Sequence, residues 1–168
     1  MAVTDLIDVV NEADEVIDTV SMQEARERGL IHRIARVMVQ DASGELLLQK
    51  RTAKLLWPNC WDNSAAGHVD AGEDYLTAAR RELFEEIGLR TDELEEVGTY
   101  FTDIMYQSYS LRRFNRVYRF ITDETPQDLQ SDEVAEVKWF SVSDAKKLVK
   151  EHPDKVTDGL KDVLDRYY

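Results

Sequence analysis

Short apolar runs, separated by turn residues, recur along most of the chain. Such runs are typical of strands, and they occur at residues 6–10, 15–20, 31–40, 45–51, 94–106, 114–122 and 133–140. The polar residues between 106 and 114 predict a connection rather than a strand. In the middle of the chain the apolar spacing changes to three and four residues, which predicts a helix over residues 73–87 with one buried stripe. The stripe consists of Leu76, Ala79, Leu83 and Ile87.

Helical patterns also occur near both ends of the chain. Ser21 and Glu24 form a capping box that starts a short helix ending near Gly29, after a hairpin formed by the first two strands. Two further helices are predicted, at residues 141–150 and 157–168. Strands flanked by helices and joined by hairpins indicate an α/β fold, an α/β/α sandwich around a mixed sheet. We expect a single domain over residues 1–168, in which residues 1–30 form the N-terminal hairpin and short helix.

Three acidic residues lie close together on the predicted central helix. Glu82 is three residues before Glu85 and four before Glu86, so the three side chains are neighbours on one face. Like charges at these spacings repel each other, which indicates either an acidic surface helix or a site whose cation comes from solution. Sites built only from carboxylates favour Mg²⁺ or Mn²⁺ over zinc.

The region around these carboxylates follows a longer pattern. Its fixed positions are Gly67, Glu73, Arg81, Glu82, Leu83, Glu85, Glu86, Gly88 and Leu89. They match every fixed position of the Nudix box, and the chain therefore resembles the Nudix family. The resemblance implies the Nudix fold, with a loop-helix-loop over residues 67–89 that binds Mg²⁺ and cleaves a nucleoside diphosphate linked to another moiety. It also implies that Arg81 pairs with Glu73 and holds the loop against the helix. The implied metal ligands are Glu82, Glu85, Glu86 and the carbonyl of Gly67.

Motifs outside the box are similar to the isopentenyl-diphosphate isomerase branch of the family. They are the segments at residues 7–16, 29–33, 47–51 and 57–68. Ala66 stands where the isomerases have a catalytic cysteine, and Arg116 stands where they have a second catalytic acid. Of the histidines that bind metal in the isomerases, His32 and His68 match and the third position is Ala25. A hydrogen-bonded structural role is the alternative for both histidines. An isomerase needs its acid and its base, so these departures favour hydrolysis on an isomerase-like scaffold.

Hydrolysis of a diphosphate needs a nucleophilic water and a group that takes its proton. A cation on the box carboxylates neutralises phosphate charge and lowers the pKa of the water. The candidate catalytic residues are Glu85, Glu82 and Glu133. The base is either a glutamate of the box or Glu133 on a later loop, and the alternative for Glu133 is an exposed loop acid.

Basic residues near the box are candidates for substrate binding. Arg51 and Lys54 are similar to residues that bind a diphosphate in the isomerase branch, and arginine does so with two hydrogen bonds at once. Arg116 is the third candidate, from a basic cluster that either steers a phosphate or forms the solvated side of a strand. The three tryptophans, Trp57, Trp61 and Trp139, are expected to pack structurally, and Trp57 is the one of them most suited to line a pocket. The basic cluster consists of Arg112, Arg113, Arg116 and Arg119.

Composition limits the classes of partner and compartment. The formal net charge of −13 argues against broad binding to nucleic acid or anionic membranes. The Nudix resemblance implies a small-molecule diphosphate as the substrate, and local cations must attract such an anion. A single cysteine, Cys60, and the lack of a signal-peptide pattern in the first residues predict a cytoplasmic protein. The identity of the diphosphate stays open, as does the choice between a monomer and a homodimer. Two alternative functions also stay open, an isomerase-like enzyme and a non-catalytic ligand-sensing domain.

Overall fold

A mixed seven-stranded sheet forms the centre of the computed structural model, which describes residues 5–168. Its strands are β3 (His32–Gln40), β4 (Leu46–Arg51), β5 (Trp61–Asp62), β6 (Ala65–His68), β7 (Glu95–Tyr106), β8 (Tyr109–Ile121) and β9 (Val134–Phe140). The order across the sheet is β5, β4, β3, β8 and β7, with β6 paired to β3 and β9 paired to β4. The β3–β8 pair is parallel, and the other pairs are antiparallel.

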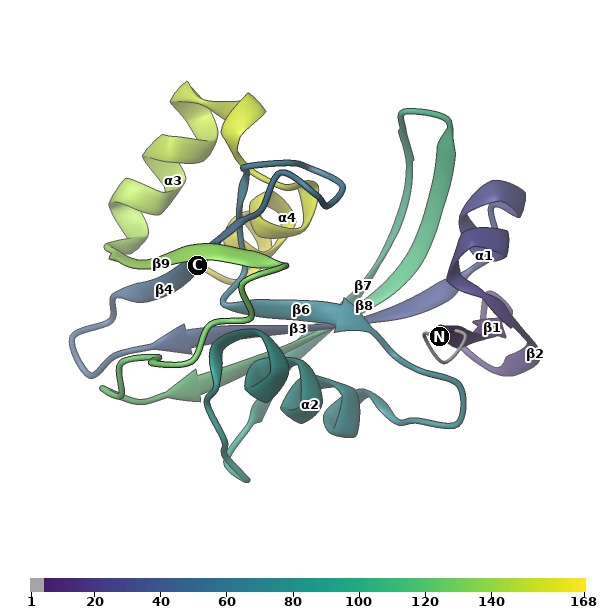
Figure 1. Ribbon diagram of the computed structural model, residues 1–168, viewed down its shortest axis with the longest axis horizontal. Coiled ribbons are helices and arrows are strands. Elements are labelled where there is room, and N and C mark those ends of the chain that lie inside the picture. The colour runs from purple at the N-terminus through teal and green to yellow at the C-terminus, as the bar shows by residue number, and fades with distance from the viewer. Residues whose placement is uncertain (1–4) are drawn as a thin grey trace.

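Helices cover both faces of this sheet (Figure 1). They are α2 (Tyr75–Ile87), α3 (Val142–Glu151), a 3₁₀ turn (Pro153–Lys155) and α4 (Asp158–Tyr167). Side chains along β3 point alternately to the two faces of the sheet. Val37 packs in the core under α2, and Met38 packs in the core under α4. This arrangement confirms the predicted α/β/α sandwich around a mixed sheet. Within residues 5–168, none of the helices has the length and apolar character needed to cross a membrane.

The N-terminal part lies beside the loop that precedes α2. It contains β1 (Leu6–Val10), β2 (Val16–Ser21) and α1 (Met22–Arg28). The Ser21 hydroxyl accepts a hydrogen bond from the Glu24 N–H at 3.1 Å, as the capping box predicts, and Gly29 ends the helix with a left-handed φ of 63°. An isolated bridge between Ile7 and Asp70 holds the hairpin against the loop.

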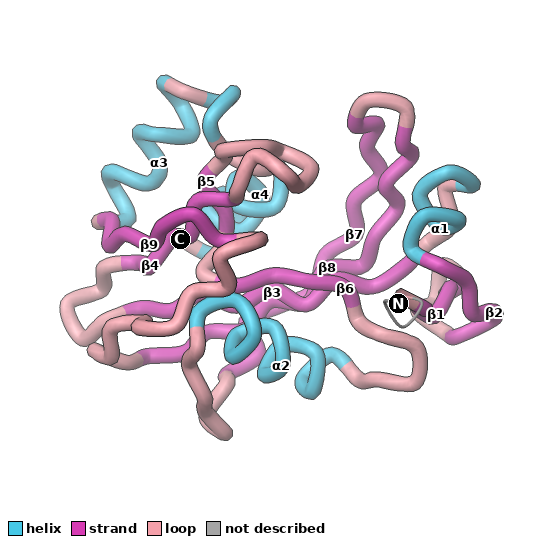
Figure 2. The backbone as a smooth tube through the Cα atoms, viewed as in Figure 1, coloured by secondary structure: helices cyan, strands magenta, loops and turns pink. Residues whose placement is uncertain are grey.

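Residues 107–113 were predicted as a polar connection, and this prediction is wrong. β7 and β8 meet at a tight turn in which Gln107 takes a left-handed φ of 54°, and the strand continues directly after it. The polar residues fit a strand because they have partners: Arg112 lies 3.3 Å from Asp103 on the opposite strand, and Arg113 turns into the protein and is buried. The resulting long hairpin rises above the rest of the sheet (Figure 2).

The central helix starts two residues later than the sequence predicts. The Asp74 side chain accepts a hydrogen bond from the Thr77 N–H at 2.8 Å and so caps the first turn. Glu73 therefore stays in the loop, free of the helical geometry and able to turn back towards the helix. Gly88 ends the helix with a left-handed φ of 74°.

Candidate active site

Arg81 on α2 ties the preceding loop to the helix. Its guanidinium donates to the two carboxylate oxygens of Glu73, at 2.9 Å each, and to the carbonyl of His68 at 2.9 Å. Two parallel hydrogen bonds from a planar fork to one carboxylate fix the geometry as well as the charge. The third guanidinium nitrogen, Nη1, donates to a carboxylate oxygen of Glu82 at 2.6 Å and to one of Glu85 at 3.3 Å. The expected Arg81–Glu73 pair is present, and the same guanidinium reaches two of the box carboxylates.

Replacing Arg81 by lysine should loosen this loop although the positive charge is kept. An ammonium group cannot make two parallel bonds to Glu73 and also reach the His68 carbonyl, so we expect a loss of about 1–3 kcal/mol in the free energy of unfolding. Chemical denaturation measures this loss. Arg80→Lys is the matched control, because the Arg80 guanidinium is more exposed and lies 3.9 Å from Asp92. Equal destabilisation by both substitutions would contradict the role given to Arg81.

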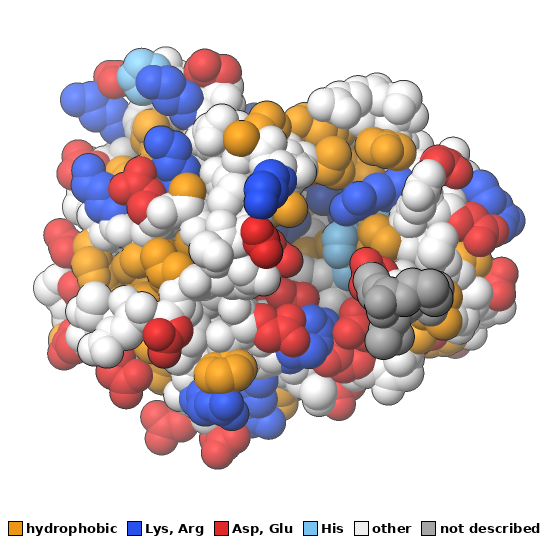
Figure 3. Space-filling model, viewed as in Figure 1, with side chains coloured by type: hydrophobic (Ala, Val, Ile, Leu, Met, Phe, Trp, Pro, Cys, Tyr) orange, Lys and Arg blue, Asp and Glu red, His pale blue; other side chains and the backbone are white. Residues whose placement is uncertain are grey.

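Four glutamates line one cleft beside β6, where acidic and basic side chains crowd together above α2 (Figure 3). They are Glu82, Glu85, Glu86 and Glu133. Glu86 is 3% exposed, and its carboxylate accepts hydrogen bonds from the Ala66 N–H at 3.0 Å and from the Gln49 side chain. A side-chain carbon on Gly67 would collide with the Glu82 carboxylate, so a glycine is needed for this helix to approach β6. The ligands expected from the sequence therefore share one cleft, and Glu133 joins them.

Burial raises the pKa of two of these carboxyl groups. Desolvation raises the pKa of Glu82 to about 7 and outweighs the lowering effect of the Arg81 guanidinium. The nearby charges of Glu85 and Glu133 add to this rise. Burial, and after it the charge of Glu82, raise the pKa of Glu86 well above its usual range. Such a cluster is high in energy when it is ionised, and a divalent cation would offset the repulsion.

The donor atoms in this cleft fit a hard divalent cation. Carboxylate oxygens and a backbone carbonyl are the ligands that Mg²⁺ and Mn²⁺ prefer. As the side chains stand within residues 5–168, no three acidic or histidine groups converge on one point. The reason is that Arg81 holds Glu82 and Glu85, while Gln49 holds Glu86. A cation bound by all three box glutamates would have to draw Glu85, whose side chain is 55% exposed, away from Arg81.

The raised pKa of Glu82 predicts that the metal-free protein loses stability as the pH rises. An unfolded glutamate ionises near pH 4.3, whereas folded Glu82 keeps its proton up to about pH 7. The folded state binds more protons in this window, so the contribution of Glu82 is complete below about pH 4 and is lost as the pH passes 7. We expect a loss of about 3–4 kcal/mol, measured by denaturation in EDTA from pH 4 to 8.

Two further measurements test this pH dependence. Glu82→Gln should make the profile less steep, because an amide does not titrate although Glu86 still does, and Mg²⁺ should restore the stability of the unaltered protein at pH 8. A profile for the unaltered protein that coincides with that of Glu82→Gln would contradict a raised pKa at this position.

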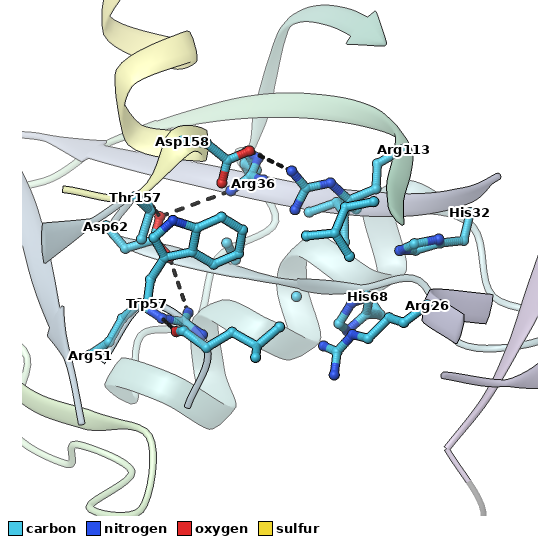
Figure 4. A pocket seen from close by; sticks show the side chains of 15 residues that line it. Arg26, His32, Arg36, Arg51, Trp57, Asp62, His68, Arg113, Thr157 and Asp158 are labelled. Atoms are coloured by element: carbon cyan, nitrogen blue, oxygen red, sulfur yellow. Dashed lines mark hydrogen bonds and ion pairs between the residues drawn. The ribbon is translucent and has the colours of Figure 1, made fainter. Parts of the chain in front are cut away.

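A second pocket adjoins the carboxylate cleft, and Figure 4 shows the side chains that line it. The two hollows share Arg26, Arg51 and the segment 66–68. Arg51 is held there because its Nε donates to the Leu56 carbonyl at 2.8 Å and its Nη1 donates to Asp62 at 3.2 Å. Among the basic residues that the sequence singled out for substrate binding, Arg51 is the one that lines both hollows.

Residues far apart in the sequence form the walls of this second pocket. Trp57 stands at one side, with its ring stacked on Tyr106 at 3.9 Å between centroids. His32 and His68 stand at the other side, with ring centroids 5.6 Å apart. Arg113 from β8 lies between them, and its guanidinium pairs with Asp158. Trp57, which the sequence marked as the tryptophan most suited to line a pocket, does line this one.

Sequence reasoning missed two basic residues of this pocket. Arg36 is 4% exposed, and its guanidinium donates to Asn63 and Asn115 at 3.0 Å each. The signal for Arg36 was a charged residue inside the otherwise apolar run at residues 31–40, which a buried strand tolerates only with partners. Arg26 on the short helix α1 had no comparable signal, because a helix of this length normally exposes its charges.

Lys54 and Arg116, which were expected to bind substrate, do not reach either hollow. Lys54 is exposed, and its ammonium lies 3.0 Å from Asp132. The Arg116 guanidinium lies over the Tyr75 ring, 4.1 Å from its centroid, and 3.4 Å from Glu96. Strand alternation explains why Arg116 does not reach the pocket. Residues three apart on a strand point to opposite faces, and Arg113 points to the face with the pocket.

Three comparisons relate the chain to known proteins. Residues 30–160 match the family model described as the NUDIX domain. The chain is 38% identical over 137 residues to the uncharacterised Nudix hydrolase PA4841 of Pseudomonas aeruginosa. The matched region covers 81% of this chain and 78% of that protein. It is 29% identical over 163 residues to isopentenyl-diphosphate Δ-isomerase 2 of Photorhabdus laumondii, covering 96% and 91%. The crystal structure of DR0079 from Deinococcus radiodurans matches with a TM-score of 0.80 and 25% identity, covering 97% of this chain and 99% of that one.

Proposed function

The chain belongs to the Nudix family, and we propose that it is a Mg²⁺-dependent hydrolase that cleaves the diphosphate bond of a nucleoside-diphosphate-linked or related small molecule. Membership of the family makes it a hydrolase acting on pyrophosphate bonds. The metal and the substrate are the parts that we propose. They rest on one observation, the cleft in which the box carboxylates, Glu133 and Arg51 meet. Mn²⁺ is the alternative cation, because it prefers the same oxygen ligands.

The residues of the cleft divide into groups that hold the cation and groups that act on the substrate. Bound Mg²⁺ neutralises phosphate charge and lowers the pKa of a coordinated water. Arg51 would bind a diphosphate oxygen, and its bonds to Leu56 and Asp62 set the orientation of the guanidinium in advance. The residues that would hold the cation are Glu82, Glu85, Glu86 and, through its carbonyl, Gly67.

Glu133 is the carboxylate that we assign to take the proton of the attacking water. Protein donors bind the three box glutamates, whereas the Glu133 side chain has no hydrogen-bond or ion-pair donor within residues 5–168. Its backbone is fixed at the same time, because its carbonyl accepts the Thr52 N–H and its N–H donates to Gln130, both at 3.0 Å. A residue whose carboxylate has no protein donor, while its backbone is fixed by hydrogen bonds, is suited to general-base catalysis.

The isomerase-like alternative lacks the groups that its chemistry needs. Ala66 lies in the segment shared by both hollows, where a methyl group offers no proton. Arg116 lies over Tyr75 and away from the pockets, so it supplies neither an acid nor a base there. The non-catalytic alternative is disfavoured for a different reason, since the chain keeps every box carboxylate although their repulsion in the metal-free state is costly.

A panel of diphosphate compounds, incubated with Mg²⁺ or Mn²⁺ and followed by mass spectrometry, tests the proposal. We expect cation-dependent release of a phosphate-containing product, and hydrolysis in ¹⁸O-water identifies which phosphorus the water attacks. Isopentenyl diphosphate belongs in the panel, because movement of its double bond without phosphate release would overturn the hydrolase in favour of the isomerase. Tight binding without turnover across the whole panel would instead support a ligand-sensing domain.

A further inference from the structure

The pocket next to the box contains three buried nitrogen atoms without hydrogen-bond partners in the described part of the chain. They are Nε of Arg26, Nε2 of His32 and Nε of Arg113. His32 is 0% exposed and Arg113 is 6% exposed, and both residues line the pocket. An unsatisfied buried polar group costs about 1–3 kcal/mol, and folded proteins rarely leave several at one place without a ligand for them.

The charges of the pocket point to an anionic ligand. Arg113 lies 2.5 Å from Asp158 and Arg51 lies 3.2 Å from Asp62, whereas Arg26 has no acidic partner among residues 5–168. Burial lowers the pKa of Arg26, and the charges of Arg113 and Arg51 lower it further, which means that three guanidinium groups repel one another here. The lining contains four arginines against two aspartates, namely Arg26, Arg36, Arg51 and Arg113 against Asp62 and Asp158. A bound anion would remove the repulsion.

His32 narrows the chemistry of that anion. Its Nδ1 lies 3.0 Å from the Leu30 carbonyl, so Nδ1 carries the proton and donates it, and Nε2 of the neutral ring can only accept. Burial lowers the pKa of His32 to about 4, which keeps the ring neutral at physiological pH. The ligand must therefore bring an O–H together with anionic oxygens. A terminal phosphate does so in its monoanionic form, which is about a tenth of the phosphate at pH 7 for a second pKa of about 6, whereas a phosphate esterified on both sides has no proton to give.

The same imidazole geometry would also suit a metal ion, but the positive charges around His32 disfavour a cation at this position. A histidine that donates through Nδ1 to a backbone carbonyl presents Nε2 as a metal ligand in many proteins. In this pocket, however, the guanidinium groups of Arg26 and Arg113 are among the charges that lower the pKa of His32, and they would repel a cation in the same way. No carboxylate other than the arginine-paired Asp62 and Asp158 lines the pocket.

We propose that Arg26, Arg113 and His32 bind the terminal phosphate of the substrate. The pocket and the carboxylate cleft share Arg26, Arg51 and the segment 66–68, so one diphosphate chain can extend from the cleft into the pocket. The substrate would then be a diphosphate or triphosphate with a free phosphoryl end, in preference to a diphosphate that carries a group on both ends. This choice of substrate rests on the proposed function, whereas phosphate binding by the pocket does not.

Titration of inorganic phosphate into the metal-free protein in EDTA tests the pocket separately from catalysis. Calorimetry should detect binding, and ¹⁵N NMR should show shifts of the Arg26 and Arg113 Nε–H signals and of His32 Nε2. Arg26→Gln is expected to weaken phosphate binding on the order of tenfold or more. Arg28→Gln is the matched control on the same helix, because Arg28 is exposed and lies 2.5 Å from Glu24. Arg28→Gln should bind phosphate as the unaltered protein does.

Further variants keep the proposal open to refutation. Arg113→Lys should also weaken phosphate binding, and it keeps the charge that Asp158 needs. Glu86→Gln should bind phosphate normally even though it loses turnover, so a failed hydrolase proposal and a failed phosphate pocket give different results. Equal phosphate affinity in the unaltered protein and in Arg26→Gln would overturn the pocket. Binding of Mn²⁺ to Glu86→Gln that disappears in a His32→Ala background would overturn it in favour of a metal site.

A comparison of kcat/KM between two classes of substrate tests whether the pocket recognises a terminal phosphate. In Arg26→Gln, kcat/KM for nucleoside diphosphates is expected to fall on the order of tenfold relative to nucleotide sugars, which have no terminal phosphate. An equal fall for both classes would refute recognition of a terminal phosphate, although the pocket would still bind an anion.

Discussion

Replacing Glu86 by glutamine is expected to abolish Mg²⁺-dependent hydrolysis while the protein stays folded. Glu86 is 3% exposed, and its carboxylate accepts the Ala66 N–H at 3.0 Å, a bond that the carbonyl of glutamine can also accept. The amide brings no negative charge to the cation, so transition-state stabilisation of several kcal/mol is lost, and kcat/KM should fall about a thousandfold or more. Rates measured across a Mg²⁺ titration separate lost affinity from lost turnover.

The same substitution should stabilise the metal-free protein. Burial and the charge of Glu82 raise the pKa of Glu86, so the ionised carboxylate is costly at pH 8, and a neutral amide removes that cost. We expect the free energy of unfolding in EDTA to rise by about 1–2 kcal/mol, as is common when a functional site is neutralised. Glu93→Gln makes the same charge change at an exposed position and serves as the control. Unchanged turnover in Glu86→Gln would refute the assignment of the metal site.

The sequence predicts the carboxylate half of the site well because that half is local. The glutamates of α2 stand three and four residues apart on one helix, and their shared face follows from helical spacing alone. The glycine before the helix and the arginine within it belong to the same continuous segment. The resemblance to the Nudix box, carried by this one segment, implied the pairing of Arg81 with Glu73, whereas the burial of Glu86 against β6 depends on how the helix packs on the sheet.

The basic half of the site could not be predicted from the sequence, because long-range packing builds it. Arg26 comes from α1, His32 begins β3, and Arg113 lies on a strand that pairs with β3 in parallel, His32 opposite Arg113. Neither the parallel pairing nor its register has a local signal. Arg113 and Arg116 were assigned to one basic cluster, but the pleat of β8 directs their side chains to opposite faces of the sheet. Because a connection was predicted at residues 107–113, Arg113 was not expected to lie on a strand.

The cleft and the pocket carry opposite charges and share the short strand β6 in their walls. On the proposed function, the acidic cleft would attract the cation, and the arginine pocket would offer the positive charge that an anionic substrate needs to approach a protein of net charge −13. Gly67 in β6 lines both hollows, and the absence of a side chain there lets the Glu82 carboxylate pack against the strand. On the two proposals above, the scissile bond would lie between two sites of opposite charge.

Replacing Glu133 by glutamine is expected to lower kcat by about a hundredfold to ten-thousandfold, which is the usual range for loss of a general base. Mg²⁺ affinity and KM should stay close to those of the unaltered protein, because the three box glutamates remain to bind the cation. Isothermal titration with Mg²⁺, together with steady-state kinetics across pH, measures both quantities. The limb of the pH–rate profile that reports the ionisation of the base should disappear with the carboxylate.

Glu136→Gln is the matched control for Glu133→Gln, since Glu136 is an exposed residue on β9 whose carboxylate lies 3.7 Å from Lys50. It should leave kcat unchanged. If Glu133→Gln loses Mg²⁺ binding and turnover together, Glu133 is a metal ligand and not the base. If Glu133→Gln keeps its kcat, the proton passes to a glutamate of the box, and Glu82 becomes the candidate because its pKa of about 7 suits proton transfer near neutral pH.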